Sequence, residues 1–118
     1  MKLKLEMMIQ QILPSVRSFV AKELVFQYKL SQAEAAELLG ITQPAISQYL
    51  NNVRGSNRLV ENKAVLGILQ NLTRCIYERK ADETHITAEL LRIYTIITGG
   101  KEDSAIGIEK NKSEQLAL

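Results

Sequence analysis

Neutral hydrogen-bonding side chains recur along residues 43–51, a stretch without a single charged residue. The amides of glutamine and asparagine each place a donor beside an acceptor, and a serine hydroxyl offers both functions. This chemistry matches the edges of nucleobases: glutamine pairs with N6 and N7 of adenine, and an apolar ring contacts the thymine methyl. The candidate base-contacting residues are Gln43, Pro44, Ser47, Gln48 and Asn51. A merely solvated helix face is the alternative, although such a face more often carries Glu or Lys.

Two short helices that meet near Gly40 would position these side chains, within a motif over residues 31–51. Ser31 followed by Glu34 forms a capping box, so a helix is expected to begin at Gln32. Gly40 suits the left-handed backbone that ends such a helix. The pattern predicts a helix-turn-helix that breaks at residues 40–42.

The second helix of the motif has its own starting signals. Thr42 is expected to cap its first turn, where Pro44 is tolerated because no backbone N–H is needed there. The small side chain of Ala36 permits the close crossing of two helices. The buried stripe is expected to contain Ile46, with Tyr49 or Leu50.

Basic residues accompany the motif. Residues 1–80 carry eleven Lys or Arg against six Asp or Glu, and no acid occurs in residues 40–56. This distribution is typical of a surface that faces phosphates, although sparse acids in a short window also arise by chance. The candidate phosphate contacts are Gln32 and Thr42 at the helix starts, with Lys29, Arg54 and Arg58 at the edges. For Arg54 and Arg58, an ordinary solvated position is an equally good interpretation.

Helical periodicity continues on both sides of the motif, and no strand pattern or repeat is present. Further helices are expected over residues 14–28, 58–80 and 87–98, with residues 1–12 as a short helix or an arm. Gly67 within the long helix is expected to mark a close helix contact. The prediction is an all-α helix-turn-helix fold of about five helices. A single domain is expected over residues 1–100, followed by a flexible tail over residues 101–118.

Other classes of protein are disfavoured. No nucleophile–base pair, catalytic carboxylate pair or phosphate-binding glycine loop is present, so no enzyme is expected. His85 lacks the further ligands that a metal site needs, and no cofactor is expected. Cys75 alone provides no internal disulfide and suits a core position in a reducing cytoplasm. No apolar run approaches a membrane span, and the first residues lack the apolar region of a signal peptide.

Residues 30–50, with residues 13–24 before them, resemble the archaeal predicted transcriptional regulators, relatives of the Cro/C1 (XRE-type) phage-repressor group. The resemblance covers about residues 10–55 and implies a lambda-repressor-like DNA-binding fold and a homodimeric regulator or repressor. It implies that Gln32 clamps a phosphate and that Gln43 and Gln48 read bases. Pro44 departs from the polar residue of several phage repressors, so their base preference does not transfer. The chain lacks the length of relatives with a ligand-binding domain, and no effector pocket or iron–sulfur sensor is expected.

These observations predict a cytoplasmic protein that binds double-stranded DNA as a homodimer, because one reading helix contacts only a few base pairs. The aliphatic residues of segment 59–98 either form the dimer surface or cover the core of the motif. Two alternatives remain for function. One is an antitoxin or adaptor that binds another protein, and the other is an architectural DNA binder with little sequence preference.

Overall fold

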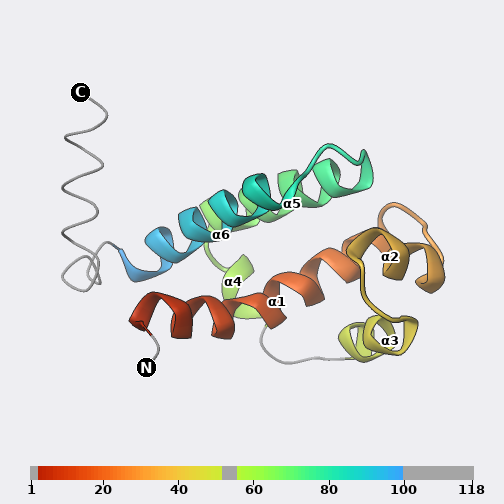
Figure 1. The fold of residues 1–118 in the computed structure, drawn as a ribbon, viewed down its shortest axis with the longest axis horizontal. Coiled ribbons are helices and arrows are strands. Elements are labelled where there is room, and N and C mark those ends of the chain that lie inside the picture. Colours follow the sequence, from red (N-terminus) through yellow and green to blue (C-terminus); the bar gives the residue numbers. More distant parts are fainter. Residues whose placement is uncertain (1–2, 52–55, 100–118) are drawn as a thin grey trace.

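The computed structural model describes residues 3–51 and 56–99, which form helices joined by short connections (Figure 1). The prediction of an all-α fold is confirmed, with six helices rather than five in the described residues. Their bounds are α1 Lys4–Phe26, α2 Gln32–Leu39, α3 Gln43–Asn51, α4 Ser56–Val60, α5 Lys63–Tyr77 and α6 Glu83–Thr98. The expected tail over residues 101–118 lies outside the described residues.

Helix α1 contacts each of the other described helices. Helices α2 and α3 pack at one end of it (Figure 1). Helices α5 and α6 run antiparallel to each other along its other side, and α4 lies between α1 and α5. One cluster of buried residues has members from all six helices. Its largest fully buried side chains include Leu24 of α1, Ile46 of α3, Leu69 of α5 and Tyr94 of α6. The helix-turn-helix is therefore packed into the same core as the C-terminal helices.

The expectation that α1 opens at Pro14 is wrong. The helix begins at Lys4 and passes through Pro14, whose ring is exposed. Proline lacks the N–H of the helical ladder and normally breaks a helix interior. Here Ile12 and Val16, each 5% exposed, anchor the turns on either side. Packing of the whole apolar stripe outweighs the local cost of the proline.

The expected helix over residues 58–80 is in fact two helices, α4 and α5. Asn62 separates them because its side-chain oxygen accepts the N–H groups of Ala64 and Val65, at 2.9 and 3.1 Å. The expected contact at Gly67 is also wrong: within residues 3–51 and 56–99, nothing but the chain neighbours and the nearby backbone of α5 itself lies within 4 Å of the position that a Cβ would take there.

Helix α6 begins at Glu83, earlier than the expected residue 87. Asp82 caps it by accepting the N–H of His85 at 2.8 Å. The helical periodicity of the sequence predicts Leu90, Leu91, Tyr94 and Ile97 on the inner side of this helix. Leu90 and Tyr94 are buried, but Leu91 and Ile97 are 39% and 41% exposed, so the prediction is wrong for these two. Cys75 is half-buried.

No helix in the described part of the chain combines the length and the apolarity needed to cross a bilayer. Within residues 3–51 and 56–99, no group of three or more side chains is arranged to hold a metal ion.

Candidate nucleic-acid interface

Helix α2 is fixed at both ends by the residues predicted for that purpose. The Ser31 hydroxyl accepts the N–H of Glu34 at 3.0 Å, and the Glu34 carboxylate accepts the N–H of Ser31 at 2.8 Å. The bond from the Ser31 backbone N–H to the Glu34 carboxylate, and after it an interaction of that carboxylate with the Ser31 hydroxyl, lower the pKa of Glu34 below its usual value. The capping box and the helix start at Gln32 are confirmed.

The turn between α2 and α3 depends on a left-handed glycine. Gly40 has φ 68° and ψ 32°, and the next N–H, that of Ile41, bonds back to the carbonyl of Ala36 at 3.0 Å. This 6→1 bond is the Schellman ending of a helix, for which glycine is the preferred residue. The chain therefore reverses direction where the sequence predicts.

Helix α3 begins at Gln43 because the hydroxyl of Thr42 accepts the N–H of Ala45 at 3.2 Å. Its inner side is anchored by Ile46, which is fully buried in the same cluster as Ala35 and Ala36 of α2. Helices α2 and α3 pack against each other, and the burial of Ile46 fixes which side of α3 points outward.

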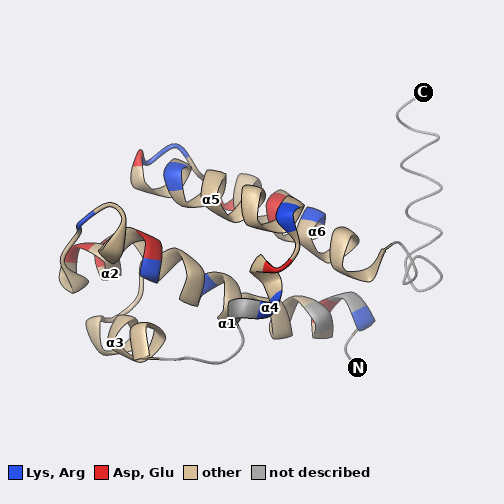
Figure 2. Cartoon of the chain, turned by 180° about the vertical axis from the view of Figure 1, so that it is seen from behind, with Lys and Arg blue, Asp and Glu red and all other residues tan. Residues whose placement is uncertain are grey.

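The outward side of α3 displays the polar residues singled out from the sequence. Gln43, Pro44, Gln48 and Asn51 are exposed, and Ser47 is half-buried. The whole helix is free of charge and appears entirely tan in Figure 2. A side with two glutamines, an asparagine and no fixed charge is suited to a surface with both donors and acceptors.

A contact between α1 and α3 was not predicted. The hydroxyl of Ser18, fully buried, donates to the carbonyl of Tyr49 at 3.3 Å. Ser18 and the equally buried Ala21 lie three residues apart on α1, beside its apolar stripe. Two small residues at this spacing allow a second helix to approach, which was the available signal in the sequence. This hydrogen bond holds the C-terminal half of α3 against α1.

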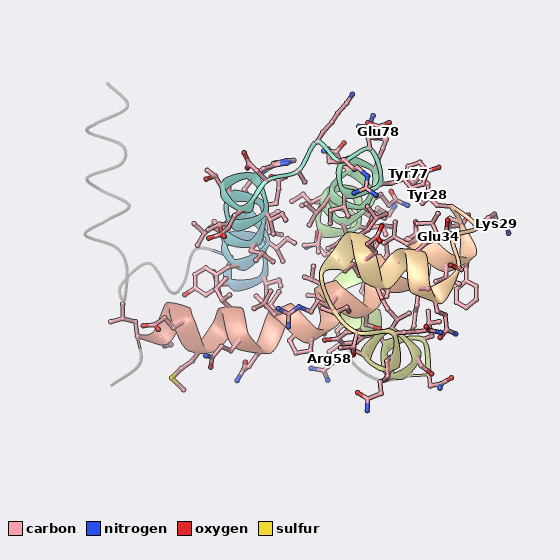
Figure 3. The ribbon with its side chains drawn as sticks, turned by 45° about the vertical axis from the view of Figure 1, so that its right-hand side comes forward. Tyr28, Lys29, Glu34, Arg58, Tyr77 and Glu78 are labelled. Atoms are coloured by element: carbon pink, nitrogen blue, oxygen red, sulfur yellow. The ribbon has the colours of Figure 1, made fainter. Side chains whose placement is uncertain are left out.

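The candidate phosphate contacts lie at different places around the motif. Gln32 is the first residue of α2 and is half-buried, whereas Thr42 is exposed at the start of α3. Figure 3 shows Arg58, exposed on α4, on the same side of α1 as α3. Lys29 extends beside α2 from the preceding connection, where its φ is 62°. Arg54 lies outside the described residues.

An aromatic contact and an ion pair join the region of the helix-turn-helix to the end of α5. The rings of Tyr28 and Tyr77 stack with their centroids 4.5 Å apart (Figure 3). Nearby, the Arg79 guanidinium lies 3.8 Å from the Glu37 carboxylate of α2, with both side chains exposed. An exposed ion pair at this distance adds little stability, so the ring contact contributes more than the ion pair to holding the two regions together. The sequence alone did not indicate this pairing.

Residues 20–56 match the family described as Helix-turn-helix, which is of the Cro/C1 type. The match starts within α1, covers α2 and α3 completely, and ends at the first residue of α4. Comparison with curated proteins and with solved structures finds no match. The matched family consists of DNA-binding domains and not of enzymes. The match and the geometry of α2 and α3 together support DNA binding by this segment.

Proposed function

We propose that the protein is a sequence-specific transcriptional regulator, a repressor, that binds double-stranded DNA as a homodimer. The observation that carries this proposal is the exposed, uncharged side of α3, oriented outward by the Gly40 turn and by the buried Ile46. In this class of motif the second helix enters the major groove with its N-terminal residues at the base edges. The similarity to archaeal regulators supports the same role.

In this arrangement Gln43 and Gln48 read base edges, with Ser47 and Asn51 beside them and the Pro44 ring against a thymine methyl. Each good base contact contributes about 1–3 kcal/mol of discrimination. Gln32 and Thr42, at the N-termini of α2 and α3, would contact phosphates, because backbone N–H groups and the helix dipole favour an anion there.

The basic residues Lys29, Arg54 and Arg58 would add contacts to the DNA backbone at the edges of this surface. Arg58 is better placed for this than Lys29, since it lies on the same side of α1 as α3 (Figure 3). Such contacts strengthen binding to every sequence alike and weaken with salt.

A homodimer would pair two reading helices on a two-fold symmetric site. Segment 59–98 was the predicted dimer surface, but Leu59, Val65 and Leu69 of this segment are buried within one chain. Exposed apolar surface remains on α6, at Leu91 and Ile97. We therefore assign the dimer contact to α6. Sedimentation of Leu91→Glu should show a shift from dimer to monomer, whereas the exposed α5 variant Gln70→Glu should leave the dimer intact.

Selection of bound fragments from random duplex DNA tests the proposed function. A palindromic consensus is expected, and Gln48→Ala should relax its preference at one position in each half-site. Gln70→Ala is the matched control, because it removes an exposed glutamine from α5 rather than from α3. An unchanged preference in Gln48→Ala would contradict the assigned reading side.

Binding measured across salt concentrations separates the competing functions. A regulator loses affinity as salt rises but keeps its ratio of specific to random binding. An architectural binder shows the salt dependence alone. An antitoxin or adaptor binds neither duplex, and that result would overturn the proposal.

A further inference from the structure

A cavity of about 190 Å³ lies where the helix-turn-helix meets the C-terminal helices. Its lining is almost wholly aliphatic. Leu39 and Ile41, which flank Gly40, form one side, and Ile76 of α5 and Ile86 of α6 form another. All four side chains are half-buried, so part of their apolar surface still contacts water. A ligand that covered this surface would gain hydrophobic free energy.

Arg17 of α1 is the one charged residue in the lining of this cavity, which includes no acid. Its side chain is exposed, and the ion pairs within residues 3–51 and 56–99 join other residues. A guanidinium presents a planar fork of donors that matches a carboxylate. The cavity therefore combines an apolar interior with a cation at its edge.

A second hollow adjoins this cavity and shares Leu39, Ile76 and Ile86 with it. The apolar surface therefore continues beyond the first cavity, toward Arg79. Arg79 already lies 3.8 Å from the carboxylate of Glu37, so Arg17 is the better anchor for an anion. An extended chain fits this shape better than a compact ring.

We propose that the cavity binds a small amphipathic carboxylate, with its carboxylate on Arg17 and its alkyl chain among Leu39, Ile76 and Ile86. An apolar cavity of about 150 Å³ accepts benzene, so the volume here suits a chain of about six to eight carbons. No residue of α3 lines the cavity, and the proposal is independent of DNA binding.

Titration calorimetry of the full chain with hexanoate, octanoate and the neutral octan-1-ol tests this proposal. Saturable binding is expected, with octanoate preferred over octan-1-ol. Arg17→Gln should weaken octanoate by about fivefold and leave octan-1-ol unchanged. Arg74→Gln is the matched control, since this exposed arginine of α5 hydrogen-bonds to Asn71 and is absent from the lining.

Ile86→Phe should fill the cavity and weaken both ligands, with circular dichroism and thermal unfolding used to verify its fold. Absence of saturable binding by all three ligands would overturn the proposal. Equal affinity for octanoate and octan-1-ol, unaltered by Arg17→Gln, would overturn the assignment of a carboxylate. NMR contacts between the cavity methyls and residues 101–118, without ligand binding, would instead assign the site to the chain's own tail.

Discussion

Helices α3 and α5 are held in the fold in different ways. Helix α3 contributes one fully buried side chain, Ile46, and its other residues are exposed or half-buried. Helix α5 contributes a row of buried residues, namely Val65, Ile68, Leu69, Leu72 and Thr73. A helix that must enter a groove cannot also be covered by protein, so its position depends on few contacts and on its end caps. The recognition surface is accordingly the part of the molecule most sensitive to single substitutions.

The largest expected effect comes from Ile46→Ala. Removing a buried aliphatic side chain costs about 3 kcal/mol of unfolding free energy, and here the loss also frees α3 from its orientation. DNA affinity should fall together with stability in denaturant titrations and anisotropy measurements.

The matched substitution Leu69→Ala removes an equally buried side chain from α5. It should cost about the same stability. It should leave DNA affinity intact wherever the protein remains folded. Equal loss of DNA binding in both folded variants would remove the contrast between the two helices.

Replacing Gly40 or Gly67 by alanine should change the free energy of unfolding in opposite directions. Gly40→Ala forces an L side chain into the left-handed region and should cost about 1.5 kcal/mol. Gly67→Ala lies inside α5 with open space around it and should stabilise by about 0.5–1 kcal/mol. Thermal unfolding of both variants measures this. A stabilised Gly40→Ala would rule out the turn described here.

The hydrogen bond from Ser18 to Tyr49 is expected to matter less. Ser18→Ala should destabilise the protein by about 1 kcal/mol, because the partly buried Tyr49 carbonyl loses a donor. Thr95→Ala removes an exposed hydroxyl that bonds only to Leu91 within α6, and it should have little effect. Hydrogen exchange along α3 should accelerate in the first variant alone.

The smallest effect is a pH dependence of opposite sign at two glutamates. The pKa of Glu34 is lowered, so its capping box stabilises the fold above the ordinary carboxyl pKa and is lost as pH falls through the lowered value. The pKa of Glu23 is raised by burial, so its ionisation opposes folding and this penalty disappears at low pH. Unfolding curves between pH 7 and 3 should flatten for Glu34→Gln and steepen for Glu23→Gln.

The sequence predicted α2 and α3 to the residue because their ends carry strong local signals. The capping and turn contacts at these ends join positions only a few residues apart, and they involve Ser31, Glu34, Gly40 and Thr42. The outward orientation of the glutamines followed from the same turn and from Ile46.

Some errors arose where distant packing decides, and one arose where a local signal was overlooked. Helix α1 continues through Pro14 because Ile12 and Val16 are buried by helices far along the chain. The break at Asn62 had a local signal, a capping residue, that the surrounding helical periodicity concealed. The bond from Ser18 to Tyr49 joins residues 31 positions apart, and no local pattern specifies such a partner.

The side chain amides of Gln43 and Gln48 offer the most direct test of the central claim, that the outward side of α3 meets DNA. In ¹⁵N NMR titrations with a duplex chosen by selection, these amides and the backbone of residues 42–51 should show the largest shifts. Large shifts confined to α5 and α6, with the α3 amides unchanged, would contradict the account.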